Sequence, residues 1–147
     1  MMIKNQSLIS KHAKSFNWAG FFLSKETFKK CSILYDFCRT IDDIVDVDSD
    51  LEIKQKKFAE FKSSFKNKDS SNCVIKNICE LIEQENIPKK IVEDLFDGVE
   101  SDLKLQVVLG NKEELLVYSY RVAGTVGLMM AKIFKVKDVF ALKGAID

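Results

Sequence analysis

The segment from Tyr35 to Asp46 carries the residues whose types and spacing could do chemistry. As a helix, it places Asp42 and Asp46 one turn apart on one face, where both carboxylates can point at a single divalent cation. Mg²⁺ prefers oxygen ligands and usually keeps water and substrate phosphates in its remaining positions. Arg39, one turn earlier, could hold a phosphate oxygen through a bidentate contact. The stripe therefore predicts half of a site for Mg²⁺ and a diphosphate.

A solvated helix face is the alternative interpretation, since acidic residues four apart are common on protein surfaces. Tyr35 and Cys38 share the stripe, however, and cysteine is rarely a surface residue. Asp42 and Asp46 also repel each other by roughly 0.2–0.5 kcal/mol, near a helix C-terminus where the macrodipole disfavours negative charge. Charges placed where they are locally unfavourable favour a cation site. The opposite side of this helix is apolar and is expected in the core: Leu34, Phe37, Ile41, Ile44 and Val45.

Bulk composition limits the class of protein. A length of 147 residues suits one domain, and 31% charged with 46% hydrophobic residues is ordinary for a soluble globular chain. The net charge of +1 gives no electrostatic case for a nucleic-acid partner. We find no apolar run of membrane-spanning length and no signal-peptide layout, so we expect a cytoplasmic protein, with peripheral membrane contact left open. Nothing indicates an oligomeric state.

Cysteine spacing and helix signals complete the outline. Cys31, Cys38, Cys73 and Cys79 form no CxxC pair, so we expect reduced, mostly buried thiols and no zinc site. The sequence predicts a single all-α domain, an antiparallel helical bundle. We expect helices over residues 5–18, from an N-cap at Ser24 to about Val47, over Leu51–Phe65, after a polar loop at 66–73 to about Glu85, from Pro88 to about Val108, over Glu113–Phe134, and from Asp138 onward.

A second informative segment runs from Tyr118 to Met130 and is apolar on nearly every side, so we expect it to be buried. Gly124 and Gly127 inside a helix cost roughly 1 kcal/mol each relative to alanine. Such glycines usually permit close approach of another helix or of a ligand. Helix packing alone accounts for the pattern, and the tyrosines could be core residues with satisfied hydroxyls. Taken alone, this segment does not establish a site.

Three blocks in this order resemble the squalene/phytoene synthase family. Lys11 to Phe16 is similar to the family's H-x-K-S-F block, and Tyr35 to Asp46 to its Y-x-x-C-R-x-x-D-D-x-x-D motif. Tyr118 to Gly127 is similar to Y-x-Y-x-V-A-G-x-V-G. The resemblance covers essentially the whole chain and is strongest to bacterial phytoene synthases.

The resemblance implies an isoprenoid synthase bundle around an apolar channel, in which two prenyl diphosphates are condensed head to head with Mg²⁺, or with Mn²⁺ as an alternative. Overall motif similarity favours geranylgeranyl diphosphate as substrate and phytoene as product, in carotenoid biosynthesis. Two other functions stay open: a squalene or dehydrosqualene synthase using farnesyl diphosphate, and a non-catalytic assembly or interaction protein with the family fold. No NADPH-binding motif is visible.

The resemblance also implies residue roles. Asp42, Asp43 and Asp46 would be Mg²⁺ ligands, while Arg39, His12 and Ser15 would contact diphosphate oxygens. Tyr118 would hold the diphosphate or guide the proton and leaving-group step, and Asp102 is a candidate for an acidic family position on the facing helix. The residues expected to line the prenyl channel are Tyr35, Cys38, Val122, Gly124, Val126 and Gly127.

The chain departs from the family in one respect. Family members are longer and carry a second aspartate-rich motif, which these 147 residues lack. Lys143 to Asp147 resembles the start of the helix that would carry that motif. We therefore expect residues 1–147 to be the N-terminal part of a single, truncated isoprenoid synthase domain, with little or no synthase activity by itself.

Overall fold

The computed structural model describes residues 21–104 and 110–146. The predicted helix over 5–18, with His12 and Ser15, lies outside these residues. Every regular element in the described part is helical, which confirms the all-α prediction. The elements are α3 (Lys25–Asp46), α4 (Leu51–Lys66), α5 (Cys73–Gln84), α6 (Lys89–Asp102), α7 (Lys112–Ser119), the π-helical η1 (Tyr120–Gly124), α8 (Thr125–Ile133) and α9 (Val139–Gly144).

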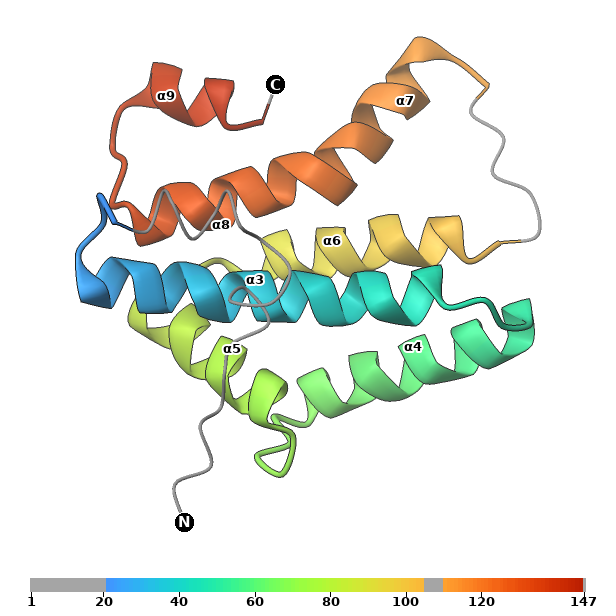
Figure 1. Ribbon diagram of the computed structural model, residues 1–147. Coiled ribbons are helices and arrows are strands. Elements are labelled where there is room, and N and C mark those ends of the chain that lie inside the picture. Colours follow the sequence, from blue (N-terminus) through green and yellow to red (C-terminus); the bar gives the residue numbers. More distant parts are fainter. Residues whose placement is uncertain (1–20, 105–109, 147) are drawn as a thin grey trace.

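Helix α3 lies at the centre of the bundle (Figure 1). It contacts α4 and α5 on one side and α8 on the other, while α6 packs along η1 and α8. Helices α7, η1 and α8 follow one another without a break and run back along α6, and α9 lies over their outer side. The bundle therefore presents one long face of α3 to α6 and α8, and this face carries the carboxylates.

Local sequence sets most helix limits. Ser24 caps α3 by accepting a hydrogen bond from the Thr27 N–H at 3.1 Å, as predicted. Asp138 caps α9 in the same way. Three helices end with a non-glycine residue at positive φ, namely Lys68, Asn86 and Lys135. After each of them the chain closes the paired backbone hydrogen bonds of a Schellman motif, which satisfies the last carbonyls.

The predicted end of α6 is wrong. We expected the helix to reach about Val108, but it ends at Asp102 with Leu103 as its C-cap. The Leu103 carbonyl instead accepts a hydrogen bond of 2.6 Å from the Gln55 side chain of α4. That contact satisfies a carbonyl that a longer helix would have used internally, so the neighbouring helix stabilises the earlier end.

The segment from Tyr118 to Met130 is less buried than its composition predicts. Within it only Gly124, Thr125 and Met129 are buried, and Ala123 is exposed. One side packs on α6 and α3, while on the other side Gly124 and Gly127 face Ala145 and Ile146, just after α9. The four cysteines are free, as predicted, but only Cys31 is buried; Cys38 and Cys79 are half-buried and Cys73 is exposed, so the expectation of mostly buried thiols is wrong.

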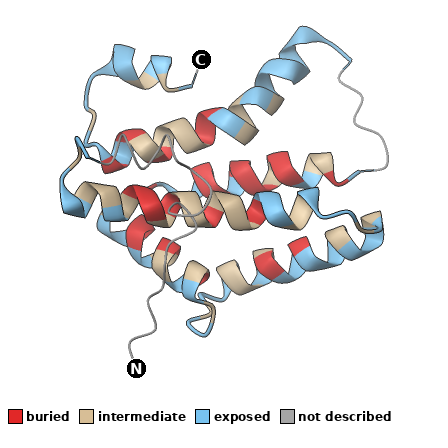
Figure 2. Ribbon diagram, in the orientation of Figure 1, coloured by how far each residue is buried: buried red, intermediate tan, exposed pale blue. Residues whose placement is uncertain are grey.

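An aromatic cluster forms the centre of the core. The Phe96 ring of α6 lies 6.0 Å from Phe37 of α3, and 5.9, 6.5 and 5.2 Å from Phe58, Phe61 and Phe65 of α4. All four contacts are edge-to-face, the arrangement that aromatic rings prefer. The predicted apolar side of α3 is confirmed as core-facing (Figure 2). Phe96 therefore joins the three helices.

Removing that ring should destabilise the fold strongly. We expect Phe96→Ala to lower the free energy of unfolding by about 3–5 kcal/mol, because it leaves a cavity among four rings. Phe140→Ala is the matched control, since Phe140 is 83% exposed, and should change stability by less than about 0.5 kcal/mol. Urea unfolding followed by circular dichroism measures both. Equal effects would contradict a core centred on Phe96.

Candidate functional site

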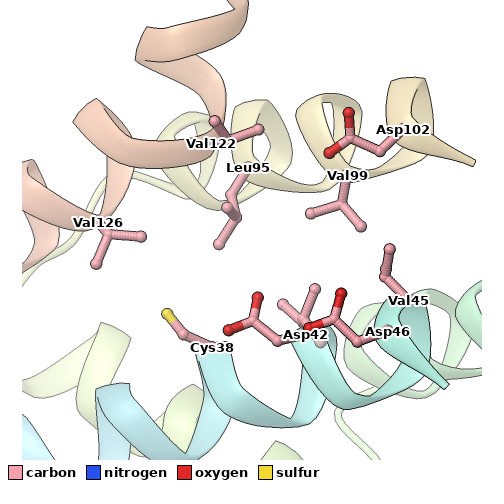
Figure 3. A pocket seen from close by; sticks show the side chains of 10 residues that line it. Cys38, Asp42, Val45, Asp46, Leu95, Val99, Asp102, Val122 and Val126 are labelled. Atoms are coloured by element: carbon pink, nitrogen blue, oxygen red, sulfur yellow. The ribbon is translucent and has the colours of Figure 1, made fainter. Parts of the chain in front are cut away.

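A cavity of about 260 Å³ lies between α3, α6 and the η1–α8 segment (Figure 3). It combines carboxylates with apolar side chains. Its lining residues are Cys38, Ile41, Asp42, Val45 and Asp46 of α3, Leu95, Val99 and Asp102 of α6, Val122 of η1 and Val126 of α8. Five residues predicted from the sequence as site residues therefore meet in one place: Cys38, Asp42, Asp46, Val122 and Val126.

The carboxylates gather toward one end of the cavity, where Val45 and Val99 lie beside them. Figure 3 shows Asp42 and Asp46 side by side on α3, with Asp102 opposite Asp46 on α6. Cys38 and Val126 lie toward the other end. An acidic end next to an apolar end suits an amphiphilic ligand with a charged head that a cation can neutralise.

Asp42 and Asp46 are exposed, and neither forms an ion pair with another described residue. Partial burial raises the pKa of Asp42, and the negative charge of Asp46 raises it further; the Arg39 charge acts in the opposite direction. Burial, together with the Asp42 charge, raises the pKa of the Cys38 thiol to about 12. A cation bound to Asp42 and Asp46 would relieve this repulsion, because it favours the ionised form of both carboxylates.

The oxygen donors fit a hard divalent ion as part of a coordination shell. Asp42 and Asp46 can supply two ligands, and water and phosphate oxygens would supply the rest, as Mg²⁺ usually requires. Within the described ranges, no group of three or more His, Cys, Asp or Glu side chains is arranged to hold a metal ion. Asp42 and Asp46 thus fit a Mg²⁺ site in which a diphosphate supplies further oxygen ligands.

Arg39 and Asp43 do not line the cavity. Arg39 Nη2 lies 2.8 Å from Asp43 Oδ1, one turn further along α3, so the two charges compensate each other. Arg39 Nε is buried and makes no hydrogen bond within the described structure. Tyr35, one turn before Cys38, is half-buried and also lies off the cavity lining. Their predicted roles in ligand binding stay predictions.

The two tyrosines of the second segment each face a carboxylate of α6. Burial raises the pKa of Tyr118, and a hydrogen bond to Asp102 raises it further. The Tyr120 hydroxyl donates to Asp94 at 3.3 Å, and Lys90 pairs with the same carboxylate at 2.7 Å. Tyr118 therefore stays protonated beside the acidic end, whereas Tyr120 belongs to a separate polar contact.

A wide helical turn positions the valines. In η1 the Thr125 N–H bonds to the Tyr120 carbonyl, five residues back. In a regular α-helix, residues four apart drift by about 40° around the axis. A π turn has more residues per turn than an α-helical turn. Tyr118, Val122 and Val126 therefore lie closer to one line parallel to the helix axis. The rare turn thus helps to keep both valines on the cavity side.

Gly124 and Gly127 face the C-terminal segment and not the cavity. A Cβ atom on Gly127 would lie 1.9 Å from the Ala145 carbonyl oxygen, and one on Gly124 would lie 3.3 Å from the Ile146 oxygen. The close approach expected at these glycines is therefore made by polypeptide in this structure. Their predicted role in lining a prenyl channel stays a prediction.

Comparison with known proteins now decides the family. Residues 9–145 match the family described as Squalene/phytoene synthase. The chain belongs to the squalene/phytoene synthase family. Members of this family are prenyltransferases that bind prenyl diphosphates and condense them head to head. They typically depend on Mg²⁺.

Three relatives are similar over most of this chain. It is 31% identical over 138 residues to a bifunctional lycopene cyclase/phytoene synthase of Pyrenophora tritici-repentis, covering 78% of this chain and 23% of the relative. It is 26% identical over 130 residues to a 4,4'-diapophytoene synthase of Staphylococcus haemolyticus (86% and 45%). It is 27% identical over 147 residues to a phytoene synthase of Pseudescherichia vulneris (92% and 47%). The chain spans at most about half the length of these relatives.

Sequence reasoning missed part of the cavity wall. Leu95 and Val99 were not singled out, although together with Asp102 they recur at helical spacing on one face of α6. Ile41 and Val45 were assigned only to the core, yet both also border the cavity.

Among the helices of the described ranges, none is long and apolar enough to cross a membrane.

The glycine contact generates a prediction. Gly127→Ala should displace the end of α9, because the new methyl group would overlap the Ala145 carbonyl. We expect faster amide hydrogen exchange over residues 139–146. Gly144→Ala is the control: its Cβ would meet no atom within 4 Å, so exchange should stay unchanged or slow down. Unaltered exchange in Gly127→Ala would show that α9 does not pack there.

Proposed function

We propose that the complete protein condenses two molecules of geranylgeranyl diphosphate head to head into phytoene, a step of carotenoid biosynthesis. The observation that supports this most directly is the cavity with an acidic end, formed by Asp42, Asp46 and Asp102, beside an apolar end. Family membership supplies the reaction type. Two of the three relatives carry phytoene synthase in their names, which favours this product.

In this proposal Asp42 and Asp46 hold Mg²⁺ together with diphosphate oxygens, with Asp43 as a further ligand. The ion, when bound, neutralises the leaving diphosphate and so eases cleavage of its C–O bond. Mn²⁺ is an alternative because carboxylate oxygens suit it as well. Arg39 would turn from Asp43 toward a diphosphate oxygen, and His12 and Ser15 would contribute further contacts.

Other side chains act on the organic part of the substrate. Tyr118, kept protonated and hydrogen-bonded to Asp102, can donate to a diphosphate oxygen or guide the proton and leaving-group step. Val122 and Val126 form an apolar wall that excludes water, which would quench an allylic cation. The raised pKa of Cys38 keeps its thiol neutral and weakly nucleophilic beside such a cation. Tyr35, Gly124 and Gly127 would extend the channel.

A shorter substrate is the second candidate. One relative is named 4,4'-diapophytoene synthase, which favours farnesyl diphosphate and a dehydrosqualene or squalene product as the alternative. Channel length would decide between the two. Offering the complete protein both diphosphates and identifying the hydrocarbon formed would separate them.

A non-catalytic assembly or interaction protein is the alternative from another functional class. The cluster of Asp42, Asp43, Asp46 and Arg39 argues against it, since such a protein has no need for carboxylates that repel each other. We expect the 147 residues alone to show little or no turnover, because one cluster of carboxylates cannot hold the Mg²⁺ ions that would neutralise two diphosphates. A cytoplasmic location with peripheral membrane contact is part of the proposal.

The carboxylates can be tested directly. Asp46→Asn in the complete protein should lower Mg²⁺-dependent diphosphate release by at least about 100-fold, since electrostatic groups of this kind are worth several kcal/mol. Removing Mg²⁺ with EDTA should have the same effect on the unmodified protein. Asp48→Asn, in the turn after α3, is the charge-matched control and should retain activity. Retained turnover in Asp46→Asn would remove these carboxylates from the mechanism.

A further inference from the structure

A buried carboxylate of α6 lies outside the candidate site. Asp94 is 8% exposed and does not line the cavity. Lys90 Nζ pairs with Asp94 Oδ1 at 2.7 Å, and the Tyr120 hydroxyl donates to Asp94 Oδ2 at 3.3 Å. Burying a carboxylate costs free energy unless its oxygens keep hydrogen-bond partners, so each oxygen needs its donor. None of the roles proposed above uses Asp94 or Tyr120.

Tyr120 is the residue at which the π turn begins. Its carbonyl accepts the hydrogen bond from the Thr125 N–H, while its side chain reaches α6. Burial and the negative charge of Asp94 raise the pKa of Tyr120, so the hydroxyl keeps the proton that it donates. A Cβ atom on Gly124 would lie 3.1 Å from Tyr120 Cδ2, so the absence of a side chain there leaves room for the tyrosine ring. Tyr120 therefore joins the start of the π turn to α6.

The π turn has a second support within its own segment. In a regular α-helix the Thr125 N–H would bond to the Arg121 carbonyl, four residues back. Here that N–H bonds to the Tyr120 carbonyl instead. The hydroxyl of Thr125, a fully buried residue, donates to the Arg121 carbonyl at 2.8 Å. The side chain thus replaces the backbone donor that the wide turn has moved away.

Gly98 of α6 lets the same turn approach closely. Gly98 is buried, and a Cβ atom there would lie 2.8 Å from Arg121 Cβ and 3.0 Å from Val122 Cγ1. A side chain at this position would push Val122 away from α6. Asp94, Gly98 and Asp102 recur every fourth residue and share one face of α6. This face therefore carries two carboxylates that bind tyrosines and, between them, the glycine that admits the turn.

We propose that Asp94 and Tyr120 are positioning residues, whose contact fixes the π turn against α6 and so holds the apolar wall of the cavity in place. That wall includes Val122 and Val126, which lie across the cavity from α3 (Figure 3). The inference rests on the proposed function, because its consequence is the exclusion of water from an allylic cation. Asp94 and Tyr120 act on the substrate only through the position of the valines.

Loss of the contact should let water reach the cation. Ionisation of a prenyl diphosphate breaks the C1–O bond and releases diphosphate. Attack of water at C1 then forms a new C–O bond and, after loss of a proton, the prenyl alcohol. In the intact site the cation instead forms a carbon–carbon bond with the second substrate. The ratio of alcohol to hydrocarbon therefore reports on the apolar wall, and it does not depend on how much of the protein is folded.

The complete protein, assayed with geranylgeranyl diphosphate and Mg²⁺, tests the proposal. After subtraction of the alcohol formed without protein, we expect Tyr120→Phe and Asp94→Ala to raise the ratio about tenfold, as for loss of a hydrogen bond to a charged group. Asp94→Asn should keep a ratio near that of the unmodified protein, because its amide oxygen still accepts from Tyr120. Lys90→Gln is the control: the Lys90 side chain is 72% exposed and the Tyr120 contact stays, so the ratio should not change.

Amide hydrogen exchange of the 147-residue chain is a second measurement, which needs no activity. We expect Tyr120→Phe to speed the exchange of the Thr125 N–H about tenfold and to leave the amides at the centre of α3 unchanged. Unchanged exchange at Thr125, equal acceleration throughout the chain, or an unaltered ratio in both Tyr120→Phe and Asp94→Ala would each overturn the proposal. Absence of hydrocarbon from the unmodified complete protein would instead overturn the proposed function, and the exchange rates would still decide whether the contact holds the turn.

Discussion

The burial of one side of α3 is the constraint on which the rest of the structure depends. Phe37 is fully buried, and its ring meets Phe96 of α6 edge-on at 6.0 Å. Turning α3 about its axis would expose Leu34, Phe37 and Ile41 at a cost of roughly 1.5–3 kcal/mol each. Asp42 and Asp46 follow in the same helical register, so they cannot avoid the gap between α3, α6 and α8.

The opposite wall of the cavity depends on two uncommon features of one long helical segment. The π turn helps to direct Val122 and Val126 toward α3, and the glycines on its other side let the Ala145–Ile146 backbone approach closely. Tyr118, at the start of this segment, joins Asp102 of α6. The carboxylates and the apolar wall thus border one cavity, although the residues come from distant parts of the chain.

Local rules predicted much of this arrangement. The Ser24 cap, the apolar side of α3 and the pairing of Asp42 with Asp46 follow from residue spacing alone. The Arg39–Asp43 pair could not be predicted with the same certainty, because Arg39 can reach a ligand or the carboxylate one turn later. The π turn has no sequence signal, and the end of α6 depends on Gln55 from another helix. Leu95 and Val99 were missed because tertiary packing decides which apolar residues border a cavity.

The central claim is that Asp42 and Asp46 hold a divalent cation together with a diphosphate in this cavity. Two-dimensional NMR of the ¹⁵N-labelled chain, titrated with MgCl₂ and inorganic diphosphate together, tests it most directly. The account predicts shifts of the amide signals of Asp42, Asp46 and Val122 that require both components and disappear in Asp42→Asn. Signals that stay in place, or shifts that do not require both components, would contradict it.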